Sequence, residues 1–176
     1  MIELIEELLK KLHCNGMLEN FQDIINTSKE KHNSCLQTLQ QLLEVEVEYR
    51  KTRSLMYRLK LARLPQIKTI ENFDANESPL KKETIDELTG CQYIQEAENI
   101  LLIGGSGTGK SHVALSLAHI ALQQGYKVKF YKFSELARKL LQAKEHHYEA
   151  NLMVHLQRFN LLVIDEVGYL PIDKQA

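Results

Sequence analysis

One glycine-rich loop constrains this chain more than any other feature: residues 104–111 read GGSGTGKS. The loop fits the pattern G-x-x-x-x-G-K-[ST] at every fixed position. An apolar run at residues 100–103 precedes it and an amphipathic stretch follows it, which is the strand, loop and helix order of a phosphate-binding loop. Glycines let backbone N–H groups converge on phosphate oxygens at the positive end of the helix. The loop therefore predicts a site for a nucleoside triphosphate.

The side chains of this loop, a Walker A motif, have separate expected roles. Lys110 is expected to reach the β and γ phosphates and to act in catalysis, and the Ser111 hydroxyl to ligate a bridging Mg²⁺. A merely flexible turn is the alternative, but such a turn has no need of Lys and Ser at its end. The residues expected to surround the nucleotide are Gly104, Gly105, Ser106, Gly107, Thr108, Gly109, Lys110, Ser111 and His112.

A second motif consists of four apolar residues, 161–164, followed by Asp165 and Glu166. Ligands of open α/β sheets gather at the carboxyl ends of the strands. A solvated strand end is the alternative interpretation, because apolar strands that end in acids are common. After a phosphate-binding loop, however, the segment reads as a Walker B strand. Asp165 is then expected in the Mg²⁺ shell, and Glu166 is expected to orient or deprotonate the attacking water.

The part of the chain before Pro65 has the composition and apolar spacing of a small all-helical domain. It is rich in Leu, Glu, Gln and Lys and contains one Gly and no Pro. Apolar residues at three- and four-residue steps predict helices over residues 2–12 and 34–64, with a further helix between them. Asn15-Gly16 is expected to end the first helix. The alternating EVEVEY of residues 44–49 would suit a strand, but the strong helix formers around it favour a helix.

The remainder of the chain alternates strands with helices. A Thr84-x-x-Glu87 capping box is expected to open a short helix after Pro65. Such alternation predicts an α/β fold, a P-loop NTPase parallel sheet with flanking helices. We therefore expect two domains, residues 1–64 and residues 65–176. The strands are expected at residues 99–103, 127–131 and 161–164, and the helices between them at residues 112–124 and 134–144.

Composition and charge exclude several classes of protein. With 44% hydrophobic and 26% charged residues, the chain has the composition of a folded globular protein. A net charge of -1 argues against a uniformly basic coat for nucleic acid, so DNA binding has to be local. One basic run is a candidate for it, although a solvated helix face explains the run equally well. Its cations are Arg50, Lys51, Arg53, Arg58, Lys60 and Arg63.

Cysteine and histidine spacing indicates no metal site. Cys14, Cys35 and Cys91 are widely spaced and are expected to be buried, reduced thiols. His146 and His147 are adjacent, so a solvated helix surface is expected there. The N-terminal residues lack the basic start of a signal peptide, and no run approaches the ~20 apolar residues that span a bilayer. A soluble, cytoplasmic protein without membrane contact is expected.

Two phrases of the sequence resemble a known family. GSGTGKSHVA at residues 105–114 looks like its Walker A segment, and IDEVGYLPIDKQ at residues 164–175 is similar to its phrase D-E-[LV]-G-Y-L-P-x-[DN]-[RK]-Q. The family is that of the IstB-like ATP-binding proteins, AAA+ helpers of insertion-sequence transposition and relatives of the DnaC-type helicase loaders. Residues 68–74 and the helix before them also fit, so the resemblance covers nearly the whole chain.

This resemblance implies a function and its partners. It implies an AAA+ ATPase that uses ATP and Mg²⁺, oligomerises on duplex DNA with little sequence preference, and assists a transposase. It also implies that Phe73 lies near the nucleotide base. A helicase loader that contacts a replicative helicase is one alternative. A truncated relic that only binds nucleotide or DNA is another.

The sequence departs from the family pattern at its end. Family members continue past the GYLP phrase with a further helix, a sensor strand and an arginine-finger region, whereas this sequence ends at Ala176. The resemblance thus implies a C-terminally truncated copy with an incomplete sheet, in which the strand between the P-loop strand and the Walker B strand is lacking. Hydrolysis is then expected to be weak or absent, because charge on the transferred phosphoryl group needs positioned donors.

Overall fold

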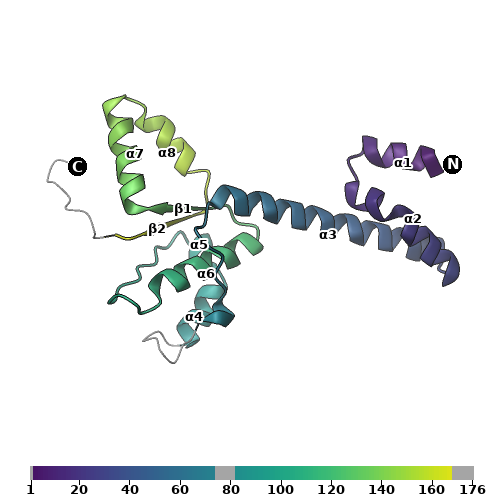
Figure 1. The fold of residues 1–176 in the computed structure, drawn as a ribbon, viewed down its shortest axis with the longest axis horizontal. Coiled ribbons are helices and arrows are strands. Elements are labelled where there is room, and N and C mark those ends of the chain that lie inside the picture. The colour runs from purple at the N-terminus through teal and green to yellow at the C-terminus, as the bar shows by residue number, and fades with distance from the viewer. Residues whose placement is uncertain (1, 74–81, 168–176) are drawn as a thin grey trace. The chain divides into compact units, whose positions relative to one another are not determined.

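The computed structural model describes residues 2–73 and 82–167. The chain divides into two compact units, Met1–Met56 and Tyr57–Ala176, and the division falls inside a long helix. Figure 1 shows the elements of each unit. The first unit holds α1 (Ile2–Lys11), α2 (Asn15–Glu30) and the first part of α3 (Cys35–Ala62). Residues 44–49 are helical, which confirms the helical interpretation of their alternating pattern.

The expected helix end at Asn15-Gly16 is wrong. The break falls earlier, where His13 adopts a φ of 55°, and Asn15 already begins α2. Packing against α3 explains the glycine instead. A Cβ on Gly16 would lie 2.5 Å from the Cβ of Tyr49, so only glycine lets α2 and α3 approach this closely.

A buried carboxylate holds the first unit together. Glu46, on α3, accepts hydrogen bonds from the Met17 amide at 3.0 Å and from the Arg50 Nε at 2.6 Å. The amide belongs to the first turn of α2, where the free N–H groups of a helix favour an anion. Burial alone would raise the pKa of Glu46, but the bonds from Arg50 and the Met17 amide outweigh it and lower the pKa.

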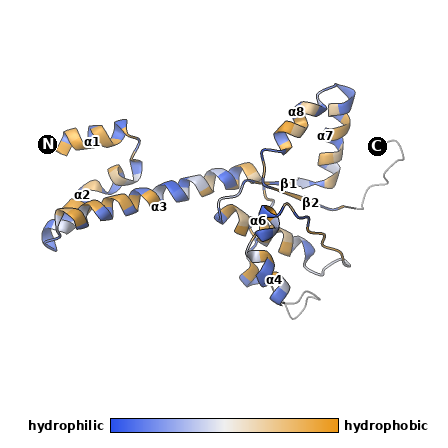
Figure 2. Ribbon diagram, turned by 180° about the vertical axis from the view of Figure 1, so that it is seen from behind, coloured by the Kyte–Doolittle hydropathy of each residue, from blue (hydrophilic) through white to orange (hydrophobic). Residues whose placement is uncertain are grey.

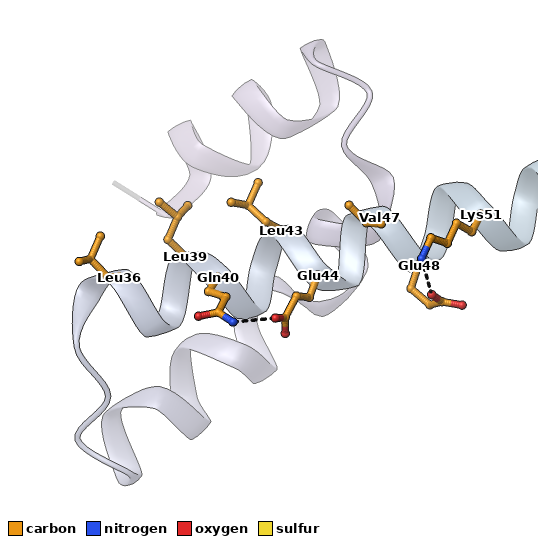
Figure 3. Close-up of a pocket in the computed structure, with 8 residues that line it drawn as sticks. All are labelled: Leu36, Leu39, Gln40, Leu43, Glu44, Val47, Glu48 and Lys51. Atoms are coloured by element: carbon orange, nitrogen blue, oxygen red, sulfur yellow. Dashed lines mark hydrogen bonds and ion pairs between the residues drawn. The ribbon is translucent and has the colours of Figure 1, made fainter.

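Much of the apolar surface of the first unit meets solvent. Met17 and Phe21 are its buried apolar side chains among the residues described. Along α3, by contrast, a row of apolar side chains points to one side of the helix and lines a shallow hollow (Figure 3). The hollow is lined by Leu36, Leu39, Gln40, Leu43, Glu44, Val47, Glu48 and Lys51. We call Leu36, Leu39, Leu43 and Val47 the α3 stripe.

The second unit is built around a parallel pair of strands. Val128 lies opposite Leu161 and Lys132 opposite Asp165 in the register of β1 and β2. The strands and the helices that follow them lie close to their expected places, because each carries its own local pattern. The elements are η1 (Ile70–Asn72), α4 (Lys82–Thr89), α5 (Gln92–Gln95), α6 (Lys110–Gln123), β1 (Val128–Lys132), α7 (Phe133–Glu145), α8 (Glu149–Leu156) and β2 (Leu161–Asp165).

Helices cover both faces of this strand pair. α4 and α6 lie on one side of β1 and β2, and α7 and α8 lie on the other (Figure 1). α6 is the most buried helix of the chain described, with Val113, Ala118 and Leu122 fully enclosed. On the opposite side, Tyr131 packs with Leu136 and Leu156. α7 carries both apolar and polar residues, as a helix between a sheet and solvent should (Figure 2). The architecture is that of an incomplete α/β fold, as expected.

Two cations cap helix ends in this unit. The Lys129 Nζ donates to the carbonyl of Leu61 at 2.8 Å, in the last turn of α3. The Arg58 Nε donates to the carbonyl of Leu122 at 3.1 Å, in the last turn of α6. Burial lowers the pKa of Lys129, and the nearby charge of Arg63 lowers it further. Both carbonyls lie in the last turn of a helix, where amides of the same helix no longer reach them, and that of Leu122 also accepts the Gly125 amide at 3.2 Å.

Three local expectations differ from the structure. Residues 99–103 have no regular secondary structure and form no ladder with any described strand, and Leu101 and Ile103 are 79% and 84% exposed. An apolar run becomes a strand only where a neighbour supplies backbone partners, which sequence periodicity cannot report. Thr84 lies inside α4, which begins at Lys82, so the capping-box prediction is wrong. α8 was not expected, because eight residues give little periodic signal.

The remaining expectations concern thiols, imidazoles and membranes. All three cysteines are free, but only Cys91 is buried, whereas Cys14 is half-buried and Cys35 is exposed. His146 and His147 are exposed at the end of α7, as expected. Within residues 2–73 and 82–167, no helix is both long and apolar enough to cross a bilayer.

Candidate functional site

Glycine backbone geometry shapes the loop before α6. Gly107 and Gly109 both have a φ of 81°, a left-handed conformation that side chains with a Cβ rarely adopt. Gly109 is also the N-cap of α6 and accepts the first helical hydrogen bond, from the Val113 amide at 2.9 Å. A Cβ on Gly109 would lie 2.5 Å from the Phe73 ring. Two independent constraints therefore require glycine where the loop joins the helix.

Lys110 lies across its own loop. Its ammonium donates to the Gly105 carbonyl and lies 3.5 Å from the Thr108 hydroxyl. The Thr108 hydroxyl donates to the same carbonyl at 3.0 Å. The Lys110 ammonium is thus held beside the loop, where it could bind an anion that the loop amides also bind.

The structure brings the loop and the acidic strand together. The Ser111 Oγ, in the first turn of α6, donates to the Asp165 Oδ1 at 3.2 Å. Asp165 is half-buried at the end of β2, and α6 packs directly on that strand. Residues far apart in the sequence, both expected to ligate Mg²⁺, therefore share one hydrogen bond.

Glu166 follows β2 in an unusual conformation. Its φ is 62°, and its amide donates to the Asp165 Oδ1 at 2.8 Å. Its carboxylate accepts a bond of 2.7 Å from the Lys132 ammonium, at the end of β1. That hydrogen bond and the negative charge of Glu166 raise the pKa of Lys132.

Lys132 is a residue near the acidic strand end that the sequence interpretation missed. It lies one position after the expected strand of residues 127–131, and Glu166 lies just beyond the strand of residues 161–164. A parallel alignment of these two strands would have placed both side chains at one sheet edge. The pairing of strands, rather than the motif itself, carries that signal.

His112 and Phe73 fasten a preceding segment to α6. The His112 Nε2 lies 2.9 Å from the Thr69 carbonyl oxygen, and the His112 and Phe73 rings are 5.5 Å apart. His112 therefore faces the segment before the loop rather than the interior of the loop. Phe73 lies against Gly109, beside the expected phosphate site.

The cations expected to contact DNA have different surroundings in the structure. Arg50 is bound by Glu46, and the half-buried Arg58 by the Leu122 carbonyl, so both have a role in the fold. Lys51 lies 3.9 Å from Glu48. The others are exposed: Arg53, whose guanidinium lies 3.4 Å from the Tyr49 hydroxyl, Lys60, and Arg63, which directly follows α3.

The loop, the helix that it opens and the acidic strand end define a P-loop NTPase fold, still incomplete in its sheet. Comparison with known proteins identifies its family: the sequence profile of the IstB-like ATP binding proteins matches residues 7–176. The chain belongs to that family.

Named relatives agree with this assignment. An insertion sequence IS21 protein of Pseudomonas aeruginosa, named for ATP binding, is 30% identical over 172 residues, covering 97% of this chain and 65% of the relative. The corresponding IS5376 protein of Geobacillus stearothermophilus is 35% identical over 178 residues, covering 100% of this chain and 70% of the relative. This chain thus spans about two thirds of the length of these curated relatives.

Proposed function

We propose that this chain binds ATP at residues 104–111 and acts as an ATPase that assists insertion-sequence transposition. The observation that carries the proposal is the Ser111–Asp165 hydrogen bond of 3.2 Å beside the glycine loop. It supports a site where the backbone amides of the loop, the Lys110 ammonium and the two expected metal ligands lie close together. The names of the relatives, which refer to insertion sequences and ATP binding, point to the same nucleotide and process.

Mg²⁺ fits the oxygen donors of this site. Among the residues that the structure describes, no group of three or more His, Cys, Asp or Glu side chains could hold a metal on its own. Mg²⁺ at phosphate sites needs only one or two protein oxygens, because phosphates and water supply the rest. The Ser111 hydroxyl and the Asp165 carboxylate suit that requirement. When bound, the ion would neutralise charge on the β and γ phosphates.

The side chains and backbone of the site would bind the phosphates and accept a proton. Loop amides and the Lys110 ammonium would bind the phosphates, with Lys110 exchanging the Gly105 carbonyl for phosphate oxygens. Glu166 would accept the proton of the attacking water. Phe73, placed against Gly109, would border the nucleotide on the side of the preceding segment.

DNA and a transposase are the proposed partners. The exposed cations at the end of α3, Lys60 and Arg63, suit phosphate contacts, which hold duplex DNA without reading its bases. Self-assembly on DNA belongs to the same proposal. The relatives named for insertion sequences favour a transposition helper over a loader of a replicative helicase.

ATP affinity tests this proposal directly. Lys110→Ala should weaken binding of a fluorescent ATP analogue by about 10- to 100-fold, since a hydrogen bond to a charged group is lost. Lys144→Ala, which removes an exposed cation of α7, is the matched control and should bind like the parent. ATP should also raise the melting temperature of the parent, because it binds the folded state. Equal affinities of the parent and Lys110→Ala would overturn the proposal.

A further inference from the structure

One half-buried histidine contacts both ends of η1. The His112 Nε2 lies 2.9 Å from the carbonyl oxygen of Thr69, the residue before η1. Because a carbonyl oxygen only accepts hydrogen bonds, Nε2 carries a proton and donates it. The Phe73 ring, which follows η1, has its centroid 5.5 Å from that of the imidazole. His112 therefore connects the whole short segment to α6.

We propose that His112 is a positioning residue that holds Phe73 beside the nucleotide and thereby sets the affinity for the nucleoside part of ATP, while the loop sets the affinity for the phosphates. This inference rests on the proposed ATP binding and adds to it a residue that acts on one part of the ligand. The contacts of the side chains support this division. His112 bonds to the segment before the loop, whereas Lys110 and Thr108 bond within the loop.

Phe73 lies where the loop passes into α6. A Cβ on Gly109, the N-cap of α6, would lie 2.5 Å from the Phe73 Cε2. The ring thus borders the first turn of a helix whose amides favour a bound phosphate. A nucleoside joined to that phosphate extends out of the loop, and the aromatic ring offers it an apolar surface at this border.

The position of Phe73 depends on the Thr69 carbonyl. This carbonyl accepts the His112 Nε2 and also the Asn72 amide at 3.3 Å, while the Phe73 amide donates to the Ile70 carbonyl at 3.0 Å. A 3₁₀ helix of three residues has little stability of its own, so its packing on α6 decides where it lies. Loss of the bond from His112 would consequently let η1 and Phe73 move together.

Two substitutions separate the hydrogen bond from the bulk of the side chain. His112→Gln keeps an amide donor near the position of Nε2, whereas His112→Leu has a similar size and no donor. His112→Leu should weaken ATP binding by about three- to tenfold, the range for one neutral hydrogen bond, and His112→Gln should stay within about twofold of the parent. Tripolyphosphate, which carries no nucleoside, should bind both variants as it binds the parent. Calorimetric titration with Mg²⁺ present measures these affinities.

Phe73→Ala tests whether His112 acts through the aromatic ring. It should weaken binding of ATP but not of tripolyphosphate. Adding His112→Leu to it should weaken ATP binding by less than about twofold more, because the ring that His112 positions is already absent. His155→Leu is the matched control, since His155 on α8 also lies 5.5 Å from a phenylalanine ring, that of Phe159. It should change neither affinity.

Binding by the parent separates the two proposals. If the parent binds neither ATP nor tripolyphosphate, the proposed function fails and the role of His112 fails with it. If the parent binds ATP, equal ATP affinities of the parent and His112→Leu overturn the role of His112 alone. Equal losses for ATP and tripolyphosphate in His112→Leu would also overturn it, because they would indicate a damaged loop. Losses in His112→Leu and Phe73→Ala that add fully in the double variant would do the same.

Discussion

The two units of this chain differ in what holds them together. In the second unit, α6 is enclosed by apolar packing, and its first turn carries Lys110 and Ser111. The first unit buries Met17 and Phe21, leaves the α3 stripe exposed, and relies on the Glu46 carboxylate. A rigid core therefore supports the phosphate loop, whereas polar contacts contribute more to the fold of the helical unit. Substitutions in the two units should therefore have different effects on unfolding free energy and on ATP binding.

The strongest test of this difference is Gly109→Val in the loop. The substitution puts a branched side chain into space occupied by the Phe73 ring, at a φ of 81°. We expect a loss of roughly 3 kcal/mol in unfolding free energy, from overpacking and backbone strain together. ATP binding should be lost even below the melting temperature. Urea unfolding and an ATP-binding titration measure the two effects.

Gly105→Val is the matched control, because no atom lies within 4 Å of a Cβ at that position. It should cost much less stability. An equal loss of stability in the two variants would show that Phe73 does not press on Gly109.

The second test removes the carboxylate of the helical unit. Glu46→Ala should lower the unfolding free energy by about 2 kcal/mol, because a buried amide and a cation lose their acceptor. ATP affinity should stay that of the parent, since the loop belongs to the other unit. Glu48→Ala, which removes an exposed acid two residues along α3 from Glu46, should change stability by less than about 0.5 kcal/mol.

The pH dependence of the unfolding free energy tests whether ionised Glu46 stabilises the folded state. The pKa of Glu46 is lower in the folded state than its ordinary value of 4.5. Its contribution is therefore complete above that value and disappears as the pH falls through the folded-state pKa. Glu46→Ala should lack this acid-sensitive component in urea unfolding curves recorded from pH 6 to pH 3. Parallel curves for the two proteins would contradict it.

The smallest effect should come from the α3 stripe. Leu36→Ser changes a side chain that is 77% exposed, so unfolding free energy should change by no more than about 0.5 kcal/mol. Val113→Ala, fully enclosed in α6, should cost about 1–2 kcal/mol through lost packing. Comparable losses in urea unfolding would mean that the stripe is packed in solution.

Sequence reasoning succeeded where the signal is local. The loop, α6, β1 and β2 each carry their pattern in consecutive residues, and the Walker motifs could be placed from order alone. It failed where a distant partner decides. Residues 99–103 lack a neighbouring strand among the residues described. Position 16 requires glycine because Tyr49, on another helix, leaves no room for a Cβ. The position of Lys132 beside the acidic strand end could not be predicted from its own sequence, because it depends on the register of two strands.

The cross-capping of α3 and α6 has a consequence for the order of folding. The last turn of α3 is completed by Lys129, and that of α6 by Arg58, across separations of 68 and 64 residues. Contacts of such long range form late, because the chain entropy of closing a large loop must be lost first. During synthesis, the end of α3 therefore emerges well before the residue that completes it. The local sequence before Pro65 ends this helix, but the side chain that binds its last carbonyl is supplied only when β1 has been made.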